Sequence, residues 1–526
     1  MRAVVRRSHF ASLHPLEYGV LPMRRPFLLI FLFALLLQSA TAQNPAATAA
    51  RQWRQTHERE IVAEFMRFVS IPDLAADPAS LRRNAIAIRE MFEQRGVGTR
   101  MLEAEHAPPV VYGEIVTPGA ERTVIIYAHY DGQPVDPKEW ATPPFAPALR
   151  DGPLESGGKV IPLPAVGQPF GLEWRIYARA AGDDKAPIMA LLAALDAIRE
   201  NKIALRSNIK FVFEGEEEAG SPHLQKILAE NKDLLRGDVF LICDGPVHQS
   251  RRQQLVFGVR GIQAMDITVY GARRELHSGH YGNWAPNPAM MLAQLLASMK
   301  ADDGRVLIDH FYDGIEPLGE MEKRAIAEAP DYDATLAQEL WLGHTDGGGK
   351  KLLELLNLPS LNIRGISSGH TGAQASNVIP AAATASIDMR LVKGIDHREA
   401  AARVVEHIRQ QGYYVVETDP DRQTLLSHPK VAKVVIADGY NAQRTPMDLP
   451  IARRVTETLE QVRGPVIKLP TMGASLPLYV IQQELGTPPI SVPIANHDDN
   501  QHTFNENLRL QNLWDGIEVM AALLTM

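Results

Sequence analysis

The chain has 526 residues, of which 45% are hydrophobic and 22% are charged, and its formal net charge is −8. This balance is typical of a globular protein, and the length predicts more than one domain. A net negative charge argues against nucleic acid and against an anionic membrane surface as partners.

The first predicted element is a secretory signal at the N-terminus. Arg24 and Arg25 precede an apolar run over residues 27–37, and the small residues 40–42 offer a cleavage site. The run is shorter than the about 20 residues that a spanning helix needs, so we expect an exported, periplasmic or secreted chain without a stable membrane span. Residues 1–42 then form the signal region, with Met23 as a possible true start. An uncleaved anchor is the alternative interpretation.

Strand and helix patterns alternate from about Gln52 to Gly261. Apolar runs rich in β-branched residues predict strands within residues 123–132, 207–218 and 238–245, and residues 186–201 predict a helix between two of them. Alternation of this kind predicts an α/β domain with a mostly parallel sheet. Cys243, the single cysteine, lies in the third run, and we expect it to pack in the core.

The pattern changes after Gly261. Residues 262–283 predict an amphipathic strand with one wet face, followed by a helix over 286–299, a long acidic stretch and a strand over 381–394. We interpret residues 262–390 as a smaller α+β domain inserted into the first. The α/β domain then consists of residues 43–261 and 391–526.

Three of the predicted strands end in potential metal ligands. The first ends with His129 and Asp131, the second with Glu217 and Glu218, and the third with Asp244. Because residues two apart in an extended chain point the same way, Asp131 can orient the imidazole of His129. Functional groups gather beyond the carboxyl ends of the strands in open parallel sheets, so we expect these side chains to converge.

Two loops add further candidates. Asp183 and Asp184 precede one helix, and His497 and His502 precede the last helix. Histidine nitrogens together with carboxylate oxygens suit Zn²⁺, and one carboxylate can bridge two metals about 3.5–4 Å apart. A Ca²⁺ site is disfavoured because Ca²⁺ prefers oxygen ligands. A glutamate that binds a cation is tolerable at the end of a buried strand, and its neighbour can serve as a general base.

In this order, the motifs HYDGQP, GDDKAP, EGEEEAGS, ICDG and HTFNEN resemble those of the M20 family of metallopeptidases, most closely its carnosinase-like dipeptidase branch. The resemblance runs from about residue 52 to the end of the chain. It implies a catalytic α/β domain interrupted by a smaller lid or dimerisation domain, two Zn²⁺ per chain, and a homodimer.

The resemblance also implies a role for each ligand candidate. His129 and Asp244 resemble ligands of one zinc, Asp183 resembles the carboxylate that bridges both metals, and Glu218 and His502 resemble further zinc ligands. Glu217 corresponds to the catalytic general base and Asp131 to the residue that orients His129. Glu216 stands where the family has a non-acidic residue.

Four residues outside these motifs resemble substrate contacts. His277 in ELHSGHYGN resembles a catalytic histidine that reaches the partner's active site and steadies the tetrahedral intermediate. Arg390 resembles an arginine that binds the substrate carboxylate. Asn377 and Ser475 occupy positions of further substrate-binding residues.

Some features depart from the family pattern. Alanines stand at 178, 180 and 186 where the family has glycine, and residues 151–172 resemble an insertion that could select substrates. We therefore expect a metallopeptidase that cleaves dipeptides or short peptides with a free carboxylate, using a metal-bridging water and a glutamate base. An N-acyl-amino-acid amidohydrolase or deacylase on the same site is the alternative, and a degenerate exported binding protein is the alternative without catalysis.

Overall fold

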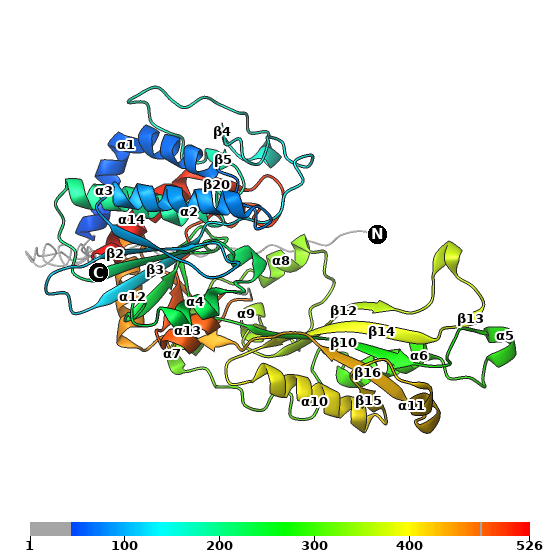
Figure 1. Ribbon diagram of the computed structural model, residues 1–526. Helices are drawn as coiled ribbons and strands as arrows, with labels where there is room; N and C mark the ends of the chain where they lie inside the picture. The colour runs from blue at the N-terminus through cyan, green and yellow to red at the C-terminus, as the bar shows by residue number, and fades with distance from the viewer. Residues whose placement is uncertain (1–43, 474–475) are drawn as a thin grey trace, which may run out of the picture. The chain divides into compact units, whose positions relative to one another are not determined.

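The computed structural model describes residues 44–473 and 476–526. Within these ranges the largest sheet has eight strands in the order β1-β2-β6-β3-β7-β19-β8-β18 (Figure 1). At its centre β3 pairs in parallel with β6 and with β7, and β7 pairs in parallel with β19. These elements confirm the predicted α/β fold with a mostly parallel sheet. The strands are β1 Gly98–Leu102, β2 Val110–Ile115, β3 Thr123–His129, β6 Asn208–Glu214, β7 Val239–Ile242, β8 Gln254–Val256, β18 Ile467–Leu469 and β19 Pro489–Ser491.

Helices cover both faces of this sheet because its central strands are apolar on both sides. In β3, Val124 and Ile126 belong to one buried cluster, and Ile125 and Tyr127 belong to another. Continuous apolar runs of this kind are typical of parallel strands buried on both faces. The first cluster includes α1 Pro45–Val69, α2 Pro78–Glu93, α3 Lys185–Glu200, α12 Pro450–Arg463 and α14 Leu510–Leu524; the second includes α4 Leu224–Glu230 and α13 Leu478–Leu485. Cys243 is buried in the first cluster, as predicted.

Helix α1 begins at Pro45, earlier than the predicted start near Gln52. The Asn44 side chain accepts hydrogen bonds from the backbone N–H groups of Ala46 and Ala47, and proline occupies the first helical position. Both features stabilise a helix start. The small residues Ala46, Ala47 and Ala50 are buried in the first turns of this helix.

A second sheet has five strands in the order β12-β14-β10-β16-β15. Its neighbours are antiparallel except for β15 and β16. Alternate residues of β10 and β14 pack under the helices α6 and α10 in a core of their own. The elements are β10 Gly261–Tyr270, α6 Pro288–Met299, β12 Ser360–Ser367, β14 Ala382–Leu391, α10 His397–Gln410, β15 Tyr414–Val416 and β16 Val431–Ile436.

This second sheet extends further along the chain than the predicted insertion over 262–390. The helix α10 and the strands β15 and β16 belong to it, and its last strand ends at Ile436. An amphipathic helix shows that one face is buried, but its sequence does not say which of two sheets buries it. The prediction assigned residues from 391 onward to the α/β domain. In the structure, α10 covers the second sheet instead.

Short elements complete the described part of the chain. Three small sheets pair β4 Ala148–Arg150 with β5 Arg175–Tyr177 and β20 Asn507–Arg509, β9 Gly258–Val259 with β17 Gln443–Arg444, and β11 Leu276–His277 with β13 Val378–Ile379. The remaining helices are α5 Ser278–Tyr281, α7 Glu320–Glu328, α8 Asp333–Glu339, α9 Leu352–Leu355 and α11 Arg422–Ser427, with 3₁₀ turns at Leu154–Ser156, Glu217–Ala219 and Gly372–Gln374.

The inserted stretch 151–172 is anchored to α1 rather than to the strand ends that carry the candidate ligands. The Phe170 backbone N–H donates to Glu58 at 3.1 Å, and the Phe170 ring lies edge-on to Trp514 of α14. One polar contact reaches the loop before β20, where the Asn500 amide lies 3.3 Å from Glu155.

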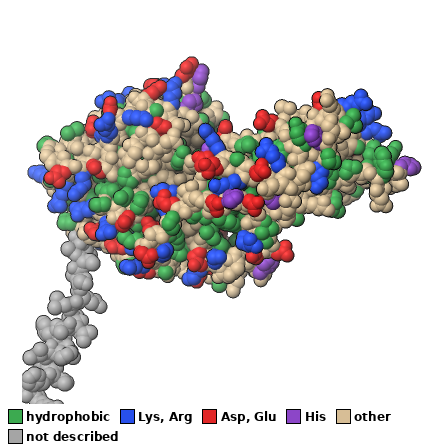
Figure 2. All heavy atoms as spheres, turned by 90° about the horizontal axis from the view of Figure 1, so that it is seen from below, with side chains coloured by type: hydrophobic (Ala, Val, Ile, Leu, Met, Phe, Trp, Pro, Cys, Tyr) green, Lys and Arg blue, Asp and Glu red, His purple; other side chains and the backbone are tan. Residues whose placement is uncertain are grey.

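Two surface properties bear on partners. On the face shown in Figure 2, basic and acidic side chains are interspersed rather than gathered into one patch. No helix in residues 44–473 or 476–526 has both the length and the hydropathy that a bilayer span requires.

Candidate metal centre

The ends of β3, β6 and β7 bring the predicted ligands together. One potential ligand atom from each of His129, Glu217 and Asp244 lies within 4.8 Å of the other two, and the same holds for Asp183, Glu218 and His502. His129, Asp183 and Asp244 are buried, whereas His502 is more than half exposed. The convergence predicted from the strand order is therefore present in the structure.

Asp183 connects the two groups through its two carboxylate oxygens. Oδ1 lies 2.9 Å from His129 Nε2, and Oδ2 lies 3.2 Å from His502 Nε2. His502 Nε2 is also 3.2 Å from Glu218 Oε2, and His129 Nε2 is 3.8 Å from Asp244 Oδ2. The Asp183 carboxylate thus faces the Nε2 atoms of both His129 and His502.

Asp131 lies behind His129, but its carboxylate has a second task. His129 Nδ1 lies 3.1 Å from the Asp131 backbone carbonyl and 3.4 Å from its carboxylate. The carboxylate itself accepts hydrogen bonds from the backbone N–H groups of Glu217 at 3.1 Å and Glu218 at 3.0 Å. Asp131 therefore ties the end of β3 to the turn that carries the glutamate pair.

The electrostatics of the centre fit a divalent cation. Burial opposes protonation of His129, yet its hydrogen bonds to Asp131 and Asp183 outweigh burial and raise its pKa well above the ordinary value. Hydrogen bonds to Asp183 and Glu218 raise the pKa of His502 to about 10. Burial and the charge of Asp183 raise the pKa of Asp244 to about 7, and burial raises the pKa of Glu217. Crowded carboxylates of this kind are best balanced by cations bound to imidazole nitrogen and carboxylate oxygen.

Several contacts that support the ligands were not predicted from the sequence. Asp184 Oδ2 accepts the His129 backbone N–H at 3.2 Å, and the buried Lys185 pairs with Asp73 at 2.7 Å. Glu506 is fully buried and accepts four hydrogen bonds from the loop that carries Asp183. Glu506 lies within the motif HTFNEN, which begins at His502, and this position is the signal that could have drawn attention to it.

Glu216, the acidic residue that departs from the family pattern, points away from the ligands. Its carboxylate lies 2.9 Å from His223 Nδ1 and accepts the His223 backbone N–H at 2.9 Å. The pair closes the loop that follows Glu217 and Glu218. Glu216 thus has a local structural contact that explains its presence.

Three of the predicted substrate residues lie in the described part of the chain. His277 and Asn377 are exposed on the paired strands β11 and β13 and their flank. Arg390, at the end of β14, lies 3.3 Å from Asp388. His277 Nδ1 accepts the Gly279 backbone N–H at 3.1 Å, and the Asn377 backbone carbonyl accepts that of Ser278 at 2.9 Å. Ser475 lies outside the described residues.

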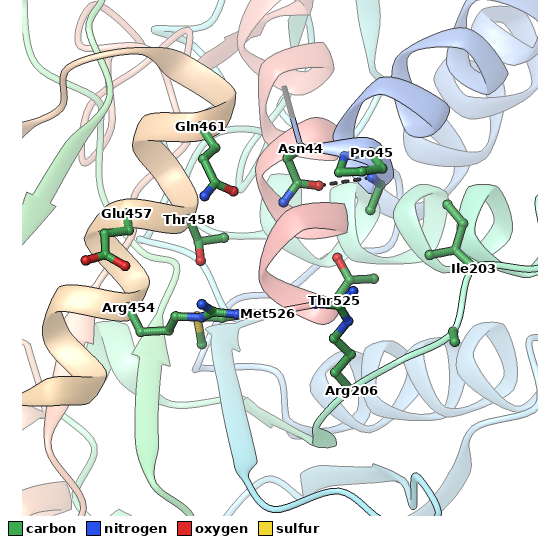
Figure 3. Close-up of a pocket in the computed structure, with 12 residues that line it drawn as sticks. Asn44, Pro45, Ile203, Arg206, Arg454, Glu457, Thr458, Gln461, Thr525 and Met526 are labelled. Atoms are coloured by element: carbon green, nitrogen blue, oxygen red, sulfur yellow. Dashed lines mark hydrogen bonds between the residues drawn. The ribbon is translucent and has the colours of Figure 1, made fainter. Parts of the chain in front are cut away.

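A cavity of about 310 Å³ lies elsewhere, between the start of α1, α12 and the end of α14 (Figure 3). Its lining includes Asn44, Arg206, Arg454, Glu457 and Met526 and none of the predicted site residues. It therefore offers no competing metal centre.

The comparisons with known proteins agree with this geometry. Residues 125–526 match the model of peptidase family M20/M25/M40. The chain belongs to this family. As a member it is a metallopeptidase, which confirms the predicted family and enzyme class.

Individual M20 proteins resemble the chain over most of its length. The Cys-Gly metallodipeptidase dug1 of Schizosaccharomyces pombe is 25% identical, with 88% of this chain and 94% of the relative covered. The Beta-Ala-His dipeptidase of Homo sapiens is 24% identical, with 94% and 96% covered. The crystal structure of Sso-CP2, an M20 family metallo-carboxypeptidase from Sulfolobus solfataricus, matches with a TM-score of 0.70 at 25% identity, covering 89% of this chain and 98% of that one.

The prediction of export is wrong. Cys-Gly metallodipeptidases of three yeasts align with 79–88% of this M20 chain, and they argue against an exported, periplasmic or secreted enzyme. The prediction used the composition of residues 23–42, which lie outside the described residues. A short apolar run behind two arginines is a local feature, and it does not by itself specify translocation.

Proposed function

We propose that this M20 metallopeptidase hydrolyses the amide bond of dipeptides or short peptides with a free carboxylate, using two Zn²⁺ per chain. The observation that carries the proposal is the carboxylate of Asp183, whose two oxygens face His129 and His502 from one position. The name of the Schizosaccharomyces pombe relative states a metallodipeptidase, and the name of the human relative states a dipeptidase.

The chain's residues divide naturally between two cations. His129, Asp183 and Asp244 would hold one, and Asp183, Glu218 and His502 would hold the other. When bound, the cations supply Lewis-acid polarisation of the scissile carbonyl and make water more acidic. Each cation would then have one histidine and two carboxylates, with Asp183 shared between them. These are nitrogen and oxygen donors of the kind that Zn²⁺ accepts.

Glu217 is the proposed general base. Its carboxylate Oε2 stands 4.0 Å from His129 Nε2, and its backbone N–H is fixed by Asp131. This anchoring keeps the carboxylate at the edge of the cluster, where it can take a proton from the attacking water and later deliver it to the leaving amine. Asp131 acts as a positioning residue because it holds both His129 and the Glu217–Glu218 turn.

Substrate binding is assigned in this proposal to Arg390 on the second sheet and to three further residues. Arg390 carries a planar guanidinium that can grip a carboxylate with two hydrogen bonds. Asn377 and Ser475 are proposed as further substrate contacts. His277 is exposed, as a residue must be if it reaches the active site of a second copy and stabilises the oxyanion there. We therefore include a homodimer in the proposal.

The test is metal content and turnover of the purified protein. We would assay free dipeptides beside their N-acetyl forms, before and after removal of metal with a chelator and after adding Zn²⁺ back. About two Zn²⁺ per chain with chelator-sensitive cleavage of free dipeptides is the expected result. Cleavage of the acylated set alone would replace the dipeptidase with a deacylase on the same site, and absence of both metal and turnover would leave a binding protein.

A further inference from the structure

Glu506 holds the loop that carries the shared ligand Asp183. Its Oε2 accepts hydrogen bonds from Arg179 Nη1 and from the Ala180 backbone N–H, both at 2.8 Å. Its Oε1 accepts from the backbone N–H groups of Gly182 at 2.8 Å and Asp183 at 3.0 Å. Both Glu506 and Arg179 are buried, so water does not replace these bonds if they are lost.

The loop needs such a support because its backbone is constrained. Ala180 has φ of 58°, a left-handed conformation that is uncommon for a residue with a side chain. Conformations of this kind persist when the surroundings hold them in place. Three of the four donors to Glu506 are backbone N–H groups between residues 180 and 183, so the carboxylate fixes the main chain rather than one rotamer.

Glu506 also connects the segment that carries Asp183 with the segment that carries His502. It follows His502 by one short loop, and Arg179 Nη2 donates to the Thr503 carbonyl at 3.0 Å in that loop. The Arg179 guanidinium therefore bonds both Glu506 and the residue after His502. The two segments that carry Asp183 and His502 are joined at this point, far apart in sequence but adjacent in space.

We propose that Glu506 is a positioning residue for the metal centre, which sets the placement of Asp183 relative to His502 through the backbone of residues 180–183. This inference rests on the proposed function for its catalytic consequence, but not for its effect on metal binding. Partners behind metal ligands typically contribute about 10–100-fold to metal affinity.

The decisive variant is Glu506→Gln. Glutamine has the same shape, but its amide nitrogen carries hydrogens and would face two of the N–H donors. The matched control is Glu518→Gln on α14, since Glu518 is also buried and accepts from an arginine, Arg51, at 2.8 and 2.6 Å. The measurements are Zn²⁺ affinity by chelator competition, the visible spectrum of the Co²⁺-substituted protein, and kcat and KM separately.

We expect Glu506→Gln to weaken Zn²⁺ binding by about 10–100-fold and to alter the Co²⁺ spectrum, while Glu518→Gln leaves both unchanged. At saturating metal, kcat should fall more than KM rises. Wild-type affinity and spectrum in Glu506→Gln would overturn the inference. If that variant does not fold, Glu506→Asp keeps the charge on a shorter side chain and must show the same weakening. A wild-type protein that binds Zn²⁺ but leaves dipeptides intact would overturn the proposed function alone.

Discussion

The two sheets of this M20 metallopeptidase hold their chemistry-bearing residues in different ways. At the ends of β3, β6 and β7, the candidate ligands are mostly buried and bonded to one another and to Asp131, Asp184 and Glu506. On the second sheet and its extensions, His277 and Asn377 are exposed. The first arrangement is set by the fold, whereas the second leaves its groups available to substrate or to a second copy. Substitutions in the two regions should therefore change different measured quantities.

The largest effect is expected for Glu217→Gln. Removing the general base should lower kcat by about 10²–10⁴-fold, while metal content stays at the wild-type level because the proposed ligands are intact. Steady-state kinetics and metal analysis of the same preparation check both parts. Glu216→Gln is the matched control, because Glu216 bonds to His223 and not to the ligands, and it should retain most of the turnover. Near-normal kcat in Glu217→Gln would remove Glu217 as the base.

A second test concerns the stability of the buried region. Asp73→Asn leaves the buried Lys185 ammonium without its charged partner at 2.7 Å, and should cost about 3–5 kcal/mol of unfolding free energy. Urea denaturation measures the change. Glu103→Gln, which breaks the exposed Arg82–Glu103 pair, should cost about 0–1 kcal/mol. Equal losses in the two variants would contradict the contrast between buried and exposed pairs.

A third test addresses the second sheet. Arg390→Lys keeps the charge but loses the bidentate geometry, so KM for free dipeptides should rise about 10–100-fold, or about 1.4–2.8 kcal/mol. Metal content and the urea midpoint should not change. Dipeptides with an amidated C-terminus provide the control, since wild type and variant should treat them alike. A loss of bound metal in Arg390→Lys would show that the two regions are not separable.

The smallest effect is expected at Asp498, between β19 and β20. Burial favours its neutral form, but hydrogen bonds and charge from Arg175, together with Arg509, lower its pKa from 3.8 to about 2. A pKa lowered by folding stabilises the protein above about pH 3.8, and this contribution disappears as the pH falls to about 2. Because Asp498 is partly exposed, Asp498→Asn should cost roughly 1 kcal/mol at pH 7. Denaturation at several pH values should show the two proteins converging in acid; a constant difference would contradict the assignment.

The sequence by itself determined the fold class and predicted the members of the candidate metal centre. Strand runs that end in His129, Glu217, Glu218 and Asp244 are local patterns, and the parallel-sheet rule places such ends at one edge. Family resemblance then assigned roles to Asp183 and His502 that proximity in the structure supports. The roles themselves stay predictions until the variants are measured.

Tertiary structure alone decided the contacts that depend on distant segments. Glu506 accepts a hydrogen bond from Asp183, although more than 300 residues of sequence separate them. Asp73 pairs with Lys185, and no periodic pattern in the sequence predicts this ion pair. The same limit applies to α10. Its sequence shows an apolar stripe, but it does not show which sheet the stripe packs against. Local sequence fixes backbone conformation and which face is apolar; which groups meet is decided by packing between elements, because hydrogen bonds and burial depend on distance in space.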